Sequence, residues 1–251
     1  MGILGFTLAG VVGLLLGVLG GGGSILLVPM LVYALGVPPK EAVVISLPIV
    51  GLTSMAGAIS HWMAGTVQAR SAVAFGLVAM AGAFAGARLS VLLPAVAQLG
   101  VLAVVMLAAG VTMLATRSPD AAVPSAGPAG GPRAWLAVVA ALAIGMLTGL
   151  IGIGGGFLFV PALVLLAKVP MHAAVGTSLV VIALNAAAGV AGYIGTIAVP
   201  WHFVLAFAAT ASVGAVVGSR LAHRLPARTL RRAFAILLLL TAGFVLSDVL
   251  F

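Results

Sequence analysis

The stretch Gly20-Gly21-Gly22-Gly23-Ser24, followed by Pro29, interrupts an apolar segment near the start of the chain. A similar stretch, Gly152-Ile153-Gly154-Gly155-Gly156, is followed by Pro161, and the two prolines are 132 positions apart (161 − 29). Nine of sixteen residues are identical between 17–32 and 149–164. The same offset relates Pro38 to Pro170, Ser46 to Ser178, Gly57 to Gly189, Arg88 to Arg220 and Pro94 to Pro226. The chain is therefore predicted to be a tandem duplication in which each half carries one interrupted apolar helix.

The composition is typical of an integral membrane protein. Hydrophobic residues make up 64% of the 251 residues and charged residues only 6%, with a mean hydropathy of +1.38. A soluble protein of this size needs far more polar surface. Apolar runs such as Phe234–Leu240 show no alternation, which favours helices over a membrane β-barrel. Eight apolar segments, each near the roughly 20 residues that cross a bilayer, are expected at 3–19 with 24–35, 41–63, 71–93, 99–115, 134–150 with 156–167, 172–194, 202–223 and 230–250.

These segments predict an all-α integral membrane protein built of two homologous four-segment repeats, each with one broken or re-entrant helix. Residues 1–115 form the N-terminal repeat, and residues 134–251 form the C-terminal repeat. The linker between them, 116–133, is rich in Pro and Gly and is not expected to hold a helix. Gly-x-x-x-Gly pairs recur within the segments, and we interpret them as sites where helix backbones approach closely.

The charged residues predict how the chain is oriented. The net charge is +8, and five arginines lie close together in one short region: Arg220, Arg224, Arg228, Arg231 and Arg232. Such clustering is typical of a cytoplasmic loop and not of a nucleic-acid-binding protein. We therefore expect a multi-pass protein of the cell (inner) membrane, with the 224–232 loop cytoplasmic and both termini outside. If the broken segments cross the membrane, the repeats are parallel; if they dip in and return, the repeats are inverted. The charges favour inversion only slightly.

The glycine breaks predict an anion-binding site. A helix that begins at Ser24, inside the membrane, has four backbone N–H groups without helical partners, and hydrocarbon cannot satisfy them. These groups and the positive end of the helix dipole attract anions. The candidate substrate-binding residues in the breaks are Gly21, Gly22, Gly23, Ser24, Gly154, Gly155 and Gly156. The alternative is that the glycines act only as a hinge or as tight packing.

Polar side chains inside apolar segments are further candidates, because each is costly in lipid unless it faces protein or a cavity. The substrate-binding candidates of this kind are Ser46, Thr53, Ser178 and Asn185. Their hydroxyls can also bond the backbone of their own helix. Arg88 and Arg220 are candidates for anion attraction, although snorkelling at a helix end explains them as well. His61, whose ordinary pKa is about 6.5, is a candidate for proton coupling or an interfacial residue.

Catalytic and metal chemistry is not predicted. The chain has no cysteine, and its three acidic residues, Glu41, Asp120 and Asp248, form no catalytic or metal-binding pattern with histidine. The second glycine stretch lacks the last glycine of a dinucleotide motif, because position 157 is Phe157, and no Walker A sequence is present. We therefore expect neither a cofactor nor an enzymatic activity.

Several motifs together resemble the TauE/SafE family of sulfite and sulfonate exporters. They are the two glycine breaks with Val28-Pro29 and Val160-Pro161, the Gly-x-x-x-Gly-x-Arg-Leu endings at 82–89 and 214–221, and the basic loop after Pro226. The resemblance spans the chain apart from the linker. It implies an integral membrane permease for small anions such as sulfite, thiosulfate or organosulfonates.

The expected function is secondary transport by alternating access, with the substrate bound between the halves near mid-membrane, against the broken-helix ends. The expected partners are a small anion and the lipid bilayer, with protons and a second copy of the chain as further candidates. A passive anion channel is the alternative, and a membrane-embedded enzyme or biogenesis factor is a less favoured one.

Overall fold

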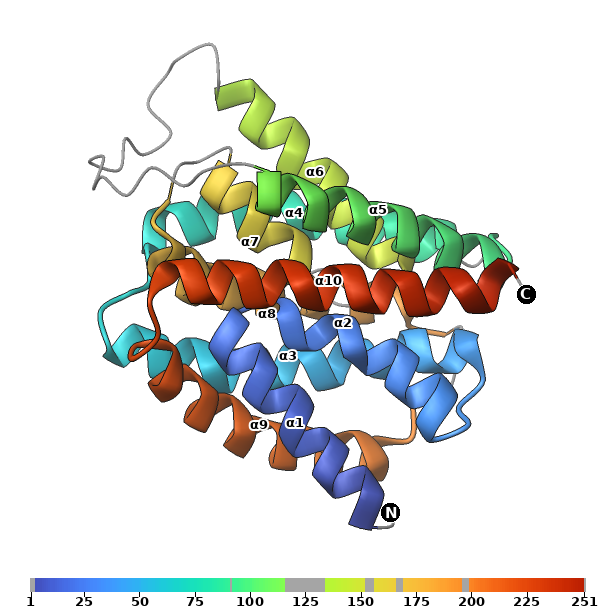
Figure 1. Ribbon diagram of the computed structural model, residues 1–251. Helices are drawn as coiled ribbons and strands as arrows, with labels where there is room; N and C mark the ends of the chain where they lie inside the picture. The colour runs from blue at the N-terminus through green and yellow to red at the C-terminus, as the bar shows by residue number, and fades with distance from the viewer. Residues whose placement is uncertain are drawn as a thin grey trace.

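The computed structural model describes residues 3–90, 92–115, 134–151, 156–165, 169–195 and 199–250. Every regular element in these ranges is helical (Figure 1). The elements are α1 (Ile3–Leu19), α2 (Gly22–Pro29), its π-helical continuation η1 (Met30–Ala34), α3 (Pro39–Met63), α4 (Ala69–Ser90), α5 (Ala95–Ala115), α6 (Ala134–Ile151), α7 (Gly156–Leu165), α8 (Met171–Tyr193), α9 (Trp201–Ala222) and α10 (Ala227–Leu250). The prediction of an all-α membrane protein is thereby confirmed.

Six of the described helices are long and apolar enough to cross a bilayer: α3, α4, α5, α8, α9 and α10. The broken segment of the first half is different, because α2 has 8 residues and η1 has 5. At about 1.5 Å per residue this segment reaches about 20 Å, which is less than the bilayer core of about 30 Å. α7, with 10 residues, is also too short. Each set of three crossings is therefore preceded along the chain by a pair of helices of which the second is too short to cross. We call these pairs, α1–α2 and α6–α7, the broken pairs.

Equivalent crossings run in opposite directions. The helices α8, α9 and α10 begin 132 residues after α3, α4 and α5, respectively. In Figure 1, α3 runs from right to left and α8 from left to right, and the other two pairs are also opposed. Contacts at the helix ends agree, because Ser90 at the end of α4 touches Tyr193 at the end of α8. A parallel repeat would need equivalent helices to run the same way, so we interpret the arrangement as an inverted repeat.

The two halves are interleaved. α1 of the first half packs against α9 of the second, and α6 of the second packs against α4 of the first. Glycines make these contacts close: a Cβ at Gly13 would lie 1.8 Å from the Ala211 carbonyl oxygen, and one at Gly145 would lie 2.1 Å from that of Ala79. The packing role predicted for the Gly-x-x-x-Gly pairs is confirmed at these positions.

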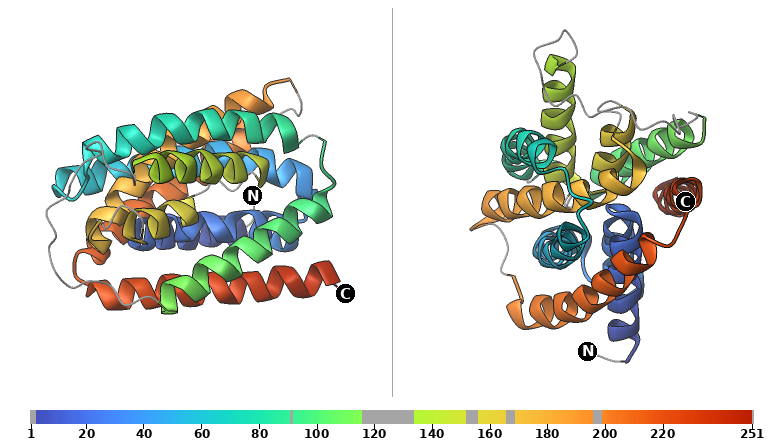
Figure 2. Two further views of the ribbon diagram at one scale, coloured as in Figure 1. Left: turned by 90° about the horizontal axis from the view of Figure 1, so that it is seen from above. Right: turned by 90° about the vertical axis from the view of Figure 1, so that its left-hand side faces the viewer.

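The centre of the molecule is formed by α3 and α8, which contact each other and are the most buried of the crossings. The broken segment α2 contacts α3 and also reaches α7 from the other half. At one edge, α5 lies across α10 (Figure 2). The predicted polar residues of α3 and α8 are thus placed in the core, beside the two broken pairs.

Candidate functional site

The first glycine break lies in the protein interior. α1 ends at Leu19, and Gly20 adopts a left-handed φ of +72°, which a residue with a Cβ rarely adopts. α2 then begins at Gly22, two residues earlier than the sequence predicts. All residues from Gly20 to Ile25 are buried. The N-terminus of α2 therefore faces protein and not the lipid, as the polar backbone at a helix start requires. One of its amides, that of Ser24, bonds the Gly21 carbonyl at 3.3 Å.

This break contacts the second half of the chain. A Cβ at Gly20 would lie 2.7 Å from the Ser178 hydroxyl oxygen on α8 and 3.1 Å from the Val160 side chain on α7. The structure thus brings the first break beside Ser178, one of the residues predicted to bind substrate. Gly20 itself belongs to the glycine motif but is missing from the predicted site. Its positive φ and its contact with Ser178 become visible only in the folded chain.

The glycines that follow have a packing role. A Cβ at Gly23 would lie 2.3 Å from the Val12 carbonyl oxygen of α1, and one at Gly22 would lie 2.8 Å from the Leu19 Cβ. These two glycines therefore let α2 fold back against α1. The Ser24 hydroxyl donates a hydrogen bond to the Gly21 carbonyl, 2.7 Å away. Gly154 and Gly155 lie outside the described residues, and Gly156 is the first residue of α7.

The predicted hydroxyl residues of the core bond their own helices. Ser46 donates to the Val43 carbonyl at 2.8 Å, Thr53 to Ile49 at 2.7 Å, and Ser178 to Val175 at 2.8 Å. All three side chains are buried. A hydroxyl held in this way still has its oxygen lone pairs, but it can donate to an anion only after rotating away from the backbone.

Asn185 is held by a residue that the sequence does not single out. Its Nδ2 donates to the Thr148 hydroxyl on α6, and Thr148 donates to the Gly145 carbonyl at 2.7 Å. The Asn185 Oδ1 is buried without a hydrogen-bond partner among the described residues, and so is the Ser54 hydroxyl on α3. Buried polar atoms of this kind are costly. Ser54 and Thr148 therefore join Asn185 as core polar residues near the broken pairs.

His61 is buried, contrary to an interfacial placement. Only 1% of its surface is exposed, whereas its neighbour Trp62 is exposed. The His61 Nε2 lies 3.2 Å from the Gly17 carbonyl oxygen on α1, and Nδ1 lies 3.1 Å from the Thr66 hydroxyl. The ring centroid is 5.0 Å from that of His223, which follows α9. The histidine therefore joins the last turn of α3 to the helix that precedes the first break.

Comparisons with known proteins place the whole chain in one family. The pattern of the sulfite exporter TauE/SafE family matches residues 5–245. The chain belongs to the TauE/SafE family. It is 35% identical over 250 residues to a probable membrane transporter protein of Xylella fastidiosa strain Temecula1, covering 94% of this chain and 92% of the relative. It is also 28% identical over 225 residues to the probable membrane transporter protein YdhB of Bacillus subtilis strain 168, covering 88% and 90%. No solved structure matches.

The side chains of the two candidate arginines of this TauE/SafE family member face away from the core. Arg88 and Arg220 are exposed, in the last turns of α4 and α9, which end on opposite sides of the molecule. The Arg88 guanidinium lies 5.5 Å from the centroid of the Phe84 ring. This placement fits snorkelling at a helix end. Because both side chains are exposed at helix ends, either arginine could attract an anion only at the entrance to the transport pathway.

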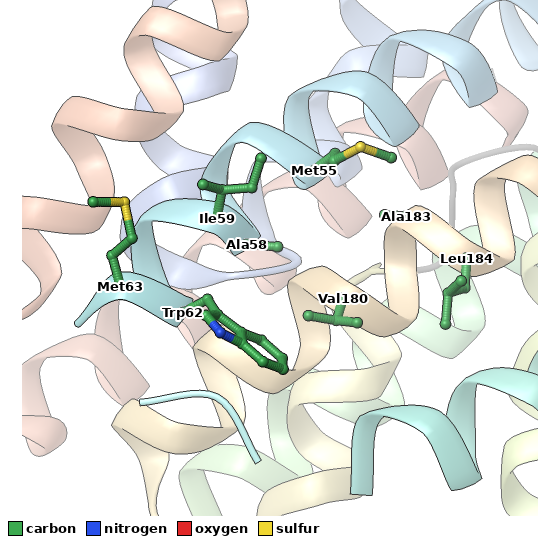
Figure 3. A pocket seen from close by; sticks show the side chains of 8 residues that line it. All are labelled: Met55, Ala58, Ile59, Trp62, Met63, Val180, Ala183 and Leu184. Atoms are coloured by element: carbon green, nitrogen blue, oxygen red, sulfur yellow. The ribbon is translucent and has the colours of Figure 1, made fainter. Parts of the chain in front are cut away.

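Two of the cavities that described residues line are largely apolar. One, of about 300 Å³, lies between α3 and α8 and is lined by residues such as Met55, Trp62 and Leu184 (Figure 3). The other, of about 490 Å³, lies between α2–η1 and α10 and includes Tyr33 and Phe244. Neither contains a predicted site residue. Among the described residues, no group of three or more His, Cys, Asp or Glu could hold a metal.

Proposed function

We propose that this TauE/SafE family transporter carries small anions across the membrane, most of all sulfur oxyanions and organosulfonates such as sulfite, thiosulfate and sulfoacetate. The observation that carries the proposal is the buried N-terminus of α2, which lies beside Ser178 from the other half of the chain. The family name and the names of the relatives indicate a transporter rather than an enzyme.

The start of α2 has the chemistry to bind an anion. The first amides of a helix lack helical partners, and the helix dipole adds about half a positive charge at that end. Inside the protein, where little water is present, such a charge is weakly screened and attracts an anion strongly. The described core offers no acidic side chain to oppose it, since Glu41 is exposed at the start of α3. We assign the substrate site to Gly21–Ser24 and Ser178, with Ser46, Thr53, Asn185 and Gly154–Gly156 completing it.

Alternating access would use the interleaved pairs. α1 and α9 meet at backbone distance, and so do α6 and α4. Contacts this close do not slide easily, so we expect each pair to move as a unit around the two breaks. Any proton coupling would run through His61 or through protonation of the substrate. A passive channel would use the same site without this motion, and counterflow separates the two mechanisms.

The orientation follows from the charges at the two ends of the molecule. One end carries six of the described basic residues: Arg70, Arg220, Arg224, Arg228, Arg231 and Arg232. The opposite end carries Lys40 and Arg88 and both chain termini. By the positive-inside rule, the arginine-rich end is cytoplasmic and both termini are outside. We propose the cell (inner) membrane as its location.

A binding screen of the purified protein tests the proposal. We expect sulfite, thiosulfate, taurine or sulfoacetate to raise the melting temperature more than acetate does, because bound ligand stabilises the folded state. The Ser178→Ala variant should lose most of this stabilisation. Thr210→Ala is the matched control, because Thr210 bonds the Ala206 carbonyl of its own helix in the same way. Stabilisation by none of these anions, or equal stabilisation of wild type and Ser178→Ala, would contradict the proposed site.

A further inference from the structure

His61 and Tyr193 make the same contact in the two halves of the chain. They are 132 positions apart, in the last turns of α3 and α8. The His61 Nε2 lies 3.2 Å from the Gly17 carbonyl oxygen, and the Tyr193 hydroxyl donates to the Gly149 carbonyl at 3.1 Å. Gly17 and Gly149 are also 132 positions apart. Both side chains are at least 95% buried. Different side chains thus reach equivalent backbone atoms.

The carbonyl that His61 reaches needs a donor. α1 ends at Leu19, so the last four carbonyls of that helix, including Gly17, have no partner in a further turn. Gly17 also packs against α9 so tightly that a Cβ would lie 2.1 Å from the Ala215 carbonyl oxygen. A buried carbonyl without a partner destabilises the fold. A side-chain donor from the neighbouring helix removes that cost.

We propose that His61 and Tyr193 are paired positioning residues, each of which caps the helix that leads into the glycine break of its half. By holding the Gly17 and Gly149 carbonyls, they fix the last turns of α1 and α6, and in the first half they fix where the break begins. The capping itself does not depend on which substrate is carried. Its consequence for transport rests on the proposed function, because the breaks are assigned there to the substrate site.

The two caps are supported differently. The Tyr193 hydroxyl is also bonded to the Ser90 hydroxyl, and the Gln98 side chain donates to the Ser90 carbonyl at 2.7 Å. The His61 ring is supported by Thr66, 3.1 Å from Nδ1. A carbonyl can only accept, so Nε2 must carry the proton in the bond to Gly17. The Thr66 hydroxyl donates its hydrogen to the His61 carbonyl at 3.1 Å. Protonation of the ring leaves the bond to Gly17 in place and lets Nδ1 donate to the Thr66 oxygen.

Hydrogen exchange of the wild-type protein and three single variants tests the caps without any substrate. Loss of the donor in His61→Leu should speed exchange at the end of α1 by about five- to tenfold, because one hydrogen bond holds that turn. His61→Gln places an amide donor near the position of Nε2, so it should keep exchange within about twofold of wild type. Tyr193→Phe, which removes a single oxygen, should speed exchange at the end of α6.

His61→Leu and Tyr193→Phe also serve as controls for each other. His61→Leu should speed exchange only at the end of α1, and Tyr193→Phe only at the end of α6. Exchange rates at the ends of α1 and α6 that match those of wild type in every variant would overturn the proposal. A His61→Gln variant whose exchange at the end of α1 is as fast as that of His61→Leu would overturn it too. Should His61→Leu fail to fold, Tyr193→Phe decides alone by its effect on α6 with α1 unchanged. A failed anion screen with these exchange effects present would reject the proposed function and leave the caps standing.

Discussion

At the scale of single residues, the first break depends on Gly20. This glycine has both a positive φ and a close contact with Ser178, whereas Gly36 has a similar φ of +67° and open space around its Cβ position. An L-residue in this conformation costs about 1–2 kcal/mol. We therefore expect both Gly20→Ala and Gly36→Ala to lose the stability that this strain costs, and Gly20→Ala to lose more, because its Cβ would also lie 2.7 Å from the Ser178 hydroxyl oxygen. Only Gly20→Ala should lose anion binding.

Melting temperature and anion-induced stabilisation of the two variants, measured side by side, check this prediction. The comparison separates backbone strain from an effect on the site, because the strain is shared. Normal anion binding in Gly20→Ala would mean that the contact with Ser178 has no part in the site, and that the break serves as a hinge.

The pH dependence of transport tests His61 as a proton carrier. Two titratable groups among the described residues interact electrostatically with its ring, His223 after α9 and His172 at the start of α8, and α1 contributes none. We expect His61→Gln to flatten the pH profile and Glu41→Gln to leave it in place. His223→Gln should keep the pH dependence but displace it along the pH axis, because its ring lies 5.0 Å from that of His61. Gln keeps a donor for Gly17, so a flattened profile reports on the proton and not on the cap. If Glu41→Gln alone erases the pH dependence, that carboxylate reaches the pathway and His61 does not carry the proton.

At the scale of helices, the glycine contacts predict a large and local effect on stability. A Cβ at Gly145 would meet the Ala79 backbone at 2.1 Å, so Gly145→Ala must push α6 away from α4. We expect a loss of at least about 2 kcal/mol in the free energy of unfolding. Gly243 on α10 has nothing within 4 Å of its Cβ position, and Gly243→Ala should be neutral or gain up to about 1 kcal/mol.

Unfolding of the two variants in detergent, followed by circular dichroism, gives the comparison. A Gly145→Ala protein as stable as wild type would show that α4 and α6 can separate freely. That result would also remove the reason for treating each interleaved pair as one moving unit.

At the scale of the whole molecule, the inverted arrangement predicts which loops face the cytoplasm. The linker 116–133 leaves the end of α5, whereas Leu92 is 79% exposed in the turn before α5, at the opposite end of the molecule. The chain has no cysteine, so single cysteines report without background. In intact cells, an impermeant thiol reagent should label Leu92→Cys and spare Ser125→Cys. The opposite labelling pattern would support a parallel repeat.

Much of the fold could be predicted because it depends on composition and spacing. Apolar runs of about 20 residues must be helices in lipid, and the 132-residue offset places helix starts such as Met171 after Pro39. Helix direction was harder to predict, because the few charges at the ends nearly balance between the two topologies. It becomes clear only from contacts such as Ser90 with Tyr193.

The details of the site were less predictable from the sequence. Ser178 lies beside Gly20 of the first break, whereas Gly22 and Gly23 pack against α1, which spacing alone does not reveal. The equivalence of His61 and Tyr193 is hidden because an imidazole and a phenol do not look alike in a repeat. Their equivalence is seen only from the hydrogen bonds that they make, His61 with the Gly17 carbonyl and Tyr193 with the Gly149 carbonyl.

The most direct test of the central claim is counterflow of radiolabelled thiosulfate in proteoliposomes. Vesicles loaded with unlabelled thiosulfate should take up the label transiently above equilibrium, the rate should saturate with concentration, and sulfite should compete. Gly20→Ala vesicles should lose this uptake while Gly36→Ala vesicles keep it. Flux that never saturates and shows no counterflow would contradict a carrier, and the absence of any flux of thiosulfate or sulfite would contradict transport of sulfur oxyanions.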